Sequence, residues 1–340
     1  MFKKAALLSA VAIVAISTPA LARDQIRIVG SSTVYPFATA VAEEFGKTSS
    51  FPTPVIESTG SGGGLKLFCA GVGTQFPDIT NSSRRIKKSE VEECAKNGAT
   101  EVTEVKIGFD GIVLANNING PTMDISRAQI WQALAKQVPV DGKLVDNPYK
   151  SWNEIDSSLP NEAIEVLGPP PTSGTRDAFV ELVMEHGCEE FDAVKAIEDK
   201  KMRGAICKSM REDGAFIEAG ENDNLIVQKL VSTPTAFGIF GYSFLEENGD
   251  KVKAATVEGI APEYDAISSG EYPVSRSMYF YVKNAHVGTV PGIKEYVAEF
   301  TSEDAFSPVG YLAQRGLIAL PDAERAEVAK TAQSLTPMKM

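Results

Sequence analysis

The sequence contains little of the chemistry that metal centres and nucleic-acid surfaces require. Its 340 residues include only two histidines, His186 and His286, and neither has a second ligand at metal-binding spacing. A histidine-based metal site is therefore not expected. Basic residues are outnumbered, with 33 Lys plus Arg against 45 Asp plus Glu and a net charge of −12. Nucleic acids and anionic membranes attract basic faces, so we expect neither as a partner.

Catalytic and cofactor-binding signatures are also missing. Residues 60–66 resemble a P-loop, but Leu65 replaces the glycine before the lysine and Leu67 replaces the metal-binding Ser or Thr. Leu65 also occupies the place of the third glycine in a dinucleotide-binding loop. No Gly-x-Ser-x-Gly elbow occurs. The sequence predicts a protein without catalytic residues, cofactors or metal, and the alternative is a secreted phosphatase or esterase that uses Ser61 or Ser173.

The first 22 residues are typical of a cleaved signal peptide. Lys3 and Lys4 precede an apolar run at 5–16, and residues 20–22 have the small-x-small pattern of a signal peptidase site. The apolar run is shorter than the roughly 20 residues of a membrane span. We expect an exported protein that begins at Arg23.

The chain contains four cysteines, Cys69, Cys94, Cys188 and Cys207. In an oxidising compartment an even number favours disulfides, and four cysteines allow three connectivities. The spacing favours the local pairs Cys69–Cys94 and Cys188–Cys207, and four buried free thiols are the alternative. Because no Cys-x-x-Cys occurs, neither a zinc knuckle nor a thioredoxin-like motif is expected.

Strands followed by small polar residues and then by helices recur along the chain. The strand-like residues 26–29, 53–57 and 78–80 each run into a loop rich in Ser, Thr, Gly or Asn, and a helical pattern follows. This succession is typical of α/β proteins whose loops lie at the carboxyl ends of the strands. A long apolar stretch at 106–115 predicts a strand that can cross between domains. Ser126 and Gln129 form a capping box that predicts the start of a helix.

Four loops concentrate hydroxyl groups, glycines and arginines. They are residues 30–33, 60–64, 82–84 and 173–176, and three of them stand directly before helices. Free N–H groups at a helix start attract anions, glycine lets the backbone approach a ligand, and arginine matches oxyanions. One such loop usually means helix capping. Four on one chain predict an anion-binding site.

Five motifs resemble those of the periplasmic phosphate-binding proteins of bacterial phosphate ABC transporters. They are residues 30–36 (GSSTVYP), 60–66 (GSGGGLK), 152–155 (WNEI), 173–175 (SGT) and 236–242 (AFGIFGY). The resemblance runs from about residue 26 to 320 and implies an α/β fold of the two-lobed periplasmic-binding-protein type (type II), with a ligand cleft between the lobes. It also implies a monomeric, periplasmic solute-binding protein that delivers inorganic phosphate to an inner-membrane ABC permease.

The same resemblance assigns phosphate contacts to matching positions. Thr33 would contribute hydroxyl and backbone donors, Val34 its N–H and Ser61 its hydroxyl. Ser173, Gly174 and Thr175 would form a donor cluster at the start of a helix.

Two positions depart from the family's pattern. Ser83 stands where the family often has an aspartate that accepts a proton from phosphate, and Pro169 stands where an arginine is common. We expect Arg84 and Arg176 to replace the missing positive charge, one from each lobe.

The identity of the anion depends on the proton acceptor. Phosphate near neutral pH carries a proton and sulfate carries none, so a site without a carboxylate would also admit sulfate. Binding of sulfate, arsenate or another tetrahedral oxyanion is therefore the alternative. Asp78 and Asp110 are the candidates for a replacement acceptor.

The long strand suggests how the chain divides into lobes. One lobe is expected to comprise residues 23–108 and 253–340, and the other residues 109–252. The chain would cross at 108–111 and return at 248–253.

Overall fold

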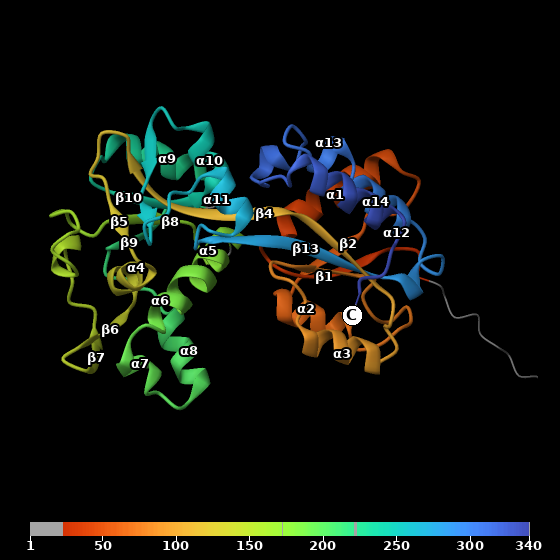
Figure 1. Ribbon diagram of the computed structural model, residues 1–340, viewed down its shortest axis with the longest axis horizontal. Coiled ribbons are helices and arrows are strands. Elements are labelled where there is room, and N and C mark those ends of the chain that lie inside the picture. Colours follow the sequence, from red (N-terminus) through yellow and green to blue (C-terminus); the bar gives the residue numbers. More distant parts are fainter. Residues whose placement is uncertain (1–22, 172, 221–222, 340) are drawn as a thin grey trace, which may run out of the picture.

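The computed structural model describes residues 23–171, 173–220 and 223–339, which form two α/β lobes joined by long strands (Figure 1). The predicted signal peptide, residues 1–22, lies outside the described residues. Within those ranges, none of the helices combines the length and the apolar character that crossing a bilayer requires.

The first lobe is built on parallel strands from the N-terminal part of the chain. β1 (Arg27–Gly30) lies between β2 (Val55–Ser58) and β3 (Ile79–Ser82) and is parallel to both. In Figure 1, α1, α12 and α14 lie on one side of this sheet and α2 and α3 on the other. The helices of the lobe are α1 (Tyr35–Thr48), α2 (Ser61–Phe68), α3 (Lys88–Lys96), α12 (Ile293–Phe300), α13 (Glu303–Phe306) and α14 (Asp322–Gln333), with 3-10 turns at η3 (Asn284–His286) and η4 (Ala313–Arg315).

Helix α1 forms where the sequence places an apolar stripe. Phe37, Val41 and Phe45 recur at every fourth position and are buried against the lobe's core. Pro36 in the first turn fits a helix start, because the N–H that proline lacks would have no partner within the helix. The predicted helix is confirmed, and its first turn follows directly on the loop 30–33.

Two antiparallel strands run between the lobes, β4 (Val102–Asn117) and β13 (Ser275–Lys283) (Figure 1). Residues 102–111 of β4 pair with β13, and residues 112–116 pair with β10 (Phe237–Gly241). The complete strand order is β2-β1-β3-β13-β4-β10-β8-β9, with β11 also paired to β4. A third connection lies beside them, because Phe109 and Ile318 exchange two backbone hydrogen bonds.

The second lobe continues the sheet and adds short ribbons. Its capping box at Ser126 and Gln129, which the sequence predicts, is confirmed at the start of α4. The strands are β5 (Asp124–Ile125), β6 (Gln137–Val140), β7 (Lys143–Asp146), β8 (Val166–Gly168), β9 (Phe216–Glu218), β11 (Val252–Ala254) and β12 (Thr256–Val257). The helices are α4 (Arg127–Leu134), η1 (Trp152–Glu154), α5 (Gly174–Phe179), the π-helical η2 (Val180–Glu185), α6 (His186–Cys188), α7 (Asp192–Lys195), α8 (Lys200–Lys208), α9 (Asp223–Ser232), α10 (Tyr242–Glu247) and α11 (Tyr264–Ser269).

Residues 252–274 pack with the second lobe, which differs from the expected return of the chain at 248–253. β11 pairs with residues 115–117 of β4, and Ile267, Tyr272 and Val274 belong to the same apolar core as Trp131 and Trp152. The chain leaves this core along β13, and Ile318 and Leu320 later return to it. Sequence patterns do not reveal that residues 252–274 pack with the second lobe, because β11 and β12 are too short to show a periodicity.

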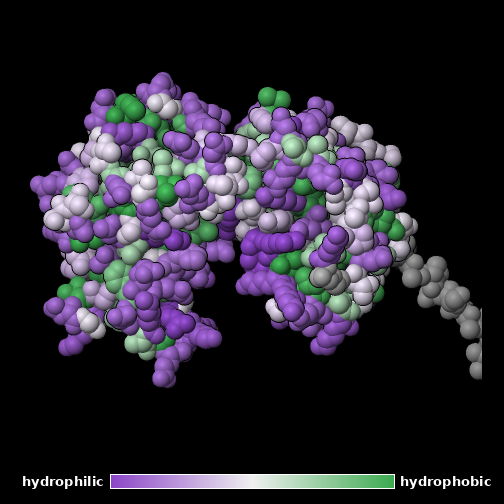
Figure 2. Space-filling model, in the orientation of Figure 1, coloured by the Kyte–Doolittle hydropathy of each residue, from purple (hydrophilic) through white to green (hydrophobic). Residues whose placement is uncertain are grey.

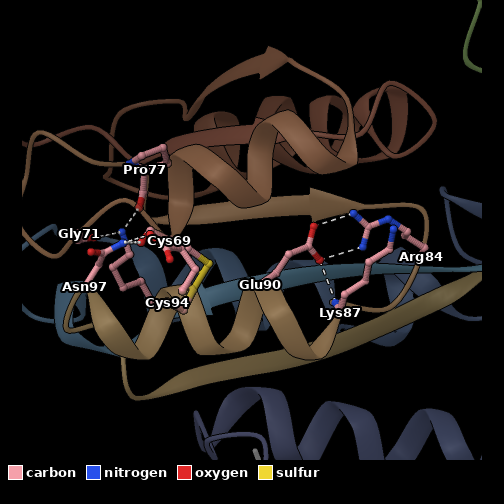
Figure 3. The surroundings of a disulfide bond; sticks show 10 residues. Cys69, Gly71, Pro77, Arg84, Lys87, Glu90, Cys94 and Asn97 are labelled. Atoms are coloured by element: carbon pink, nitrogen blue, oxygen red, sulfur yellow. Dashed lines mark hydrogen bonds and ion pairs between the residues drawn. A yellow bond between two sulfur atoms is a disulfide. The ribbon is translucent and has the colours of Figure 1, made fainter. Parts of the chain in front are cut away.

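Both predicted disulfides are present. Cys69–Cys94 joins the end of α2 to α3 (Figure 3), and Cys188–Cys207 joins α6 to α8. All four cysteines are buried. Each bond therefore ties two helices within one lobe.

Candidate functional site

Loops from the two lobes meet at the starts of two helices. One loop leads from β1 into α1, and the other leads from β8 into the helical run that begins with α5. The hydroxyl of Ser32 donates a hydrogen bond of 2.5 Å to Oδ2 of Asp177 in the other lobe. The backbone of Gly174 is so close that a Cβ on it would lie 2.9 Å from the carbonyl oxygen of Ser32. The two lobes thus touch at the predicted anion-binding loops.

A cavity of about 740 Å³ lies at this contact, and we call it the interlobe cavity. Residues of both lobes line it, and Figure 2 shows hydrophilic side chains on both sides of the hollow between the lobes. Hydroxyl and backbone donors come from the loops before α1 and α5. The polar residues that line the cavity include Ser32, Thr33, Thr39, Ser173, Thr175, Ser243, Glu43, Asp110, Asp223 and Arg315.

Four of the predicted site residues line the interlobe cavity: Thr33, Ser173, Gly174 and Thr175. Thr33 is buried, and its Oγ1 accepts a hydrogen bond of 2.5 Å from Nη2 of Arg276. Oγ of Ser173 accepts from the N–H of Thr175 at 3.2 Å and so caps the start of α5. Although these loops are far apart in the chain, the structure brings them together.

Three other predicted residues do not line this cavity. The N–H of Val34 donates to Oγ of Ser31 at 3.3 Å within its own loop. The hydroxyls of Ser61 and Ser83 lie 3.0 Å apart, and the N–H of Ser83 also donates to Oγ of Ser61 at 3.0 Å. In this conformation Ser61 and Ser83 bond to each other at the ends of β2 and β3.

Arg84 pairs with a carboxylate of the first lobe and does not line the interlobe cavity. Its Nη1 and Nη2 donate to the two carboxylate oxygens of Glu90 at 2.9 and 2.7 Å (Figure 3). These hydrogen bonds raise the pKa of Arg84 above its ordinary value. Because Glu90 also accepts from the N–H of Lys87 at the start of α3, the pair fixes the beginning of that helix.

Arg176 does not line the interlobe cavity either. Its Nη1 donates to the carbonyl oxygen of Pro169 at 3.0 Å, and its guanidinium lies 4.5 Å from the ring centre of Phe216. It lines a different cavity, together with Glu218 and Lys136. Burial lowers its pKa. The side chain therefore packs within the second lobe.

Sequence patterns gave no indication of Arg276, which contacts Thr33 of the loop before α1 although it does not itself line the interlobe cavity. It lies on β13, and only 7% of its side chain is exposed. Besides Thr33, it contacts Oε2 of Glu181 at 2.6 Å and Oδ2 of Asp110 at 3.5 Å. No local signal marks this arginine, because it is not next to a Ser-Gly loop and its neighbours depend on strand pairing.

Three carboxyl groups line the interlobe cavity: Glu43, Asp110 and Asp223. Burial raises the pKa of Asp110, and the nearby charge of Arg276 opposes that shift. Burial also raises the pKa of Asp223 to about 6. The other candidate acceptor, Asp78, is fully buried elsewhere, where it contacts Arg23 and His286. The structure thus places Asp110, and not Asp78, at the cavity.

Comparison with known proteins agrees with this architecture. A sequence model of the PBP superfamily domain matches residues 15–304. Protein SphX of Synechococcus elongatus is 33% identical over 259 residues, which are 74% of this chain and 66% of that protein. The phosphate-binding protein PstS of Staphylococcus saprophyticus is 28% identical over 88% of this chain and 81% of its own length.

A solved structure is similar over almost the whole chain. The crystal structure of a possible phosphate binding protein from Planctomyces limnophilus has a TM-score of 0.72 and 27% sequence identity, and the match covers 92% of this chain and 98% of that one. The superfamily model also spans well over half of the present sequence. The chain therefore belongs to the PBP superfamily.

Proposed function

We propose that this protein captures inorganic phosphate between its two lobes and delivers it to an ABC permease of the inner membrane. The observation that carries the proposal is the meeting of hydroxyl-bearing loops from both lobes at the interlobe cavity. Hydroxyl and backbone donors surround a tetrahedral oxyanion well, and an arginine adds charge-assisted hydrogen bonds. The names of the PstS relative and of the Planctomyces limnophilus protein both refer to phosphate, which supports this choice among oxyanions.

The lobes would close on the ligand by bending at the strands that join them. We assign residues 23–108 and 275–339 to one lobe and 109–274 to the other, following the strand pairing and the apolar cores. Hinge closure of two lobes around a ligand is a common way of trapping it. The protein would act in the periplasm as a monomer, after removal of residues 1–22.

An enzyme acting through Ser61 or Ser173 is the alternative of a different class. The hydroxyl of Ser61 is paired with Ser83, and that of Ser173 caps its own helix. A serine nucleophile needs a neighbouring base that takes its proton. These hydroxyl contacts favour a binding role over catalysis.

Isothermal titration calorimetry with phosphate, sulfate and a phosphate monoester tests the proposal. We expect heat of binding with phosphate at one site per chain and neither binding nor turnover of the ester. Sulfate binding without phosphate binding would overturn the choice of ligand. Hydrolysis of the ester, measured as released phosphate, would favour the enzyme instead.

A further inference from the structure

Arg276 and Asp110 are directly opposite each other on the two strands that join the lobes. They are register partners in the antiparallel pairing of β13 and β4. Residues opposite each other on adjacent strands project from the same face of the sheet. Their side chains meet there, with Nε of Arg276 3.5 Å from Oδ2 of Asp110.

The hydrogen bonds of this pair are incomplete. The five N–H groups of an arginine can all donate. Nη2 of Arg276 donates to Thr33 and Nη1 donates to Glu181, but Nε has no hydrogen-bond partner in the described chain. Oδ2 of Asp110 is also buried without a partner there. The two atoms form an ion pair with each other, but at 3.5 Å the contact is longer than a normal hydrogen bond, so each atom lacks a short hydrogen bond.

The surroundings of the pair indicate a ligand as the missing hydrogen-bond partner. Asp110 and Thr33, both in contact with Arg276, line the interlobe cavity. The Arg276 side chain is more than nine-tenths buried, so water screens its charge poorly. Arg84 pairs with Glu90 and Arg176 stacks on Phe216, and neither lines the interlobe cavity. Arg315 also lines the cavity but is exposed.

We propose that Arg276 and Asp110 form the charged centre of the anion site: Arg276 donates to ligand oxygens, and Asp110 accepts a hydrogen bond from a protonated ligand oxygen. This inference rests on the proposed function and names the residues that select its ligand. A phosphate monoanion or dianion has an O–H group to donate to Asp110. Sulfate has only acceptor oxygens, and these would face the carboxylate without a proton between them.

Calorimetry on single variants of the full protein tests the role of Arg276. We expect Arg276→Met to weaken phosphate binding by about tenfold to hundredfold, because a charge-assisted hydrogen bond is lost. The matched variants Arg84→Met, Arg176→Met and Arg127→Met should each bind within about threefold of the wild type, because none of these arginines lines the interlobe cavity. Arg276→Lys keeps a cation beside Asp110 but lacks the planar fork, so it covers the case in which Arg276→Met does not fold.

The role of Asp110 has a separate readout. In Asp110→Asn we expect the ratio of phosphate to sulfate affinity to fall by about tenfold or more, because the amide can donate to sulfate. Circular dichroism melts without ligand check that each variant is folded.

The outcomes separate this inference from the proposed function. If the wild type does not bind phosphate, the proposed function fails and the inference fails with it. If the wild type binds but Arg276→Met and Arg276→Lys bind equally well, only the inference is overturned. It is also overturned if one of the three control arginines causes the larger loss, or if Asp110→Asn leaves the affinity ratio unchanged.

Discussion

The backbone of Gly174 packs against the carbonyl oxygen of Ser32 across the two lobes, where a Cβ would lie 2.9 Å away. The same atom would lie 3.0 Å from Cα of Thr33, so a side chain at residue 174 would collide with main chain. Main-chain atoms cannot rotate away as the end of a long side chain can. Glycine at this position therefore permits the lobes to close.

Gly174→Ala should weaken phosphate binding without destabilising either lobe. Overpacking of this kind commonly costs about 1–3 kcal/mol, which corresponds to about tenfold or more in affinity. The cost falls on the closed state, since alanine is a better helix former than glycine within α5. Calorimetry and a ligand-free melt measure the two effects.

Gly204→Ala is the matched control, because a Cβ at that position in α8 would meet no atom within 4 Å. It should leave phosphate affinity unchanged. Equal affinities for Gly174→Ala and the wild type would contradict the tight closure seen here.

Arg176→Met should change stability more than binding. The guanidinium stacks on Phe216 and donates to Pro169, contacts that lie within the second lobe. We expect a loss of about 1–2 kcal/mol in the free energy of unfolding. Urea denaturation measures it, and phosphate affinity should stay close to that of the wild type. A large loss of affinity with unchanged stability would show that Arg176 turns toward the ligand.

Asp223 should make the protein less stable as the pH rises from about 4 to about 6. Its pKa is raised to about 6, mainly by burial, whereas an unfolded aspartate titrates near 3.9. Between these values the native carboxyl is protonated and the unfolded one is ionised, so unfolding releases a proton and becomes easier at higher pH.

Asp223→Asn should therefore stabilise the protein at pH 8 by about 2 kcal/mol and have little effect at pH 4. The amide oxygen can still accept the hydrogen bond of 3.1 Å that the N–H of Gly241 donates to Asp223. Urea denaturation at both pH values measures the difference. A variant that is less stable than the wild type at pH 8 would rule out the burial effect.

Removing either disulfide should lower the free energy of unfolding by a similar amount, because the entropy of closing a loop depends only weakly on its length. The bonds Cys69–Cys94 and Cys188–Cys207 have sequence separations of 25 and 19. Loops of this length correspond to about 3 kcal/mol in the chain-entropy estimate. The double alanine variant of each pair should show this loss in urea denaturation. A change well below 1 kcal/mol would indicate that the unfolded chain is already compact there.

Local patterns in the sequence were sufficient to predict a large part of this fold. The alternation of strands, polar loops and helices predicts the α/β class, and the capping box at Ser126 and Gln129 begins a helix as predicted. Cysteine spacing predicts both disulfides. The loop at 173–175 also lines the interlobe cavity. Each of these features depends on residues that are close in the chain.

The charged part of the site depends on contacts that sequence patterns do not encode. Arg84 lies beside a predicted loop, but the carboxylate of Glu90 on the next helix binds it in a bidentate pair. Arg176 directly follows the Ser-Gly-Thr motif in the sequence, but its guanidinium packs on the ring of Phe216 in β9. Proximity along the chain therefore does not determine which groups these two guanidinium groups contact.

The sequence by itself determined the fold class, the superfamily, the disulfides and the polar loops that precede α1 and α5, because capping, spacing and motifs act over short stretches. The tertiary structure decided that residues 252–274 belong to the second lobe and that Arg276 faces Asp110. The reason is that an antiparallel register joins residues far apart in the chain, and it determines which charges are buried together.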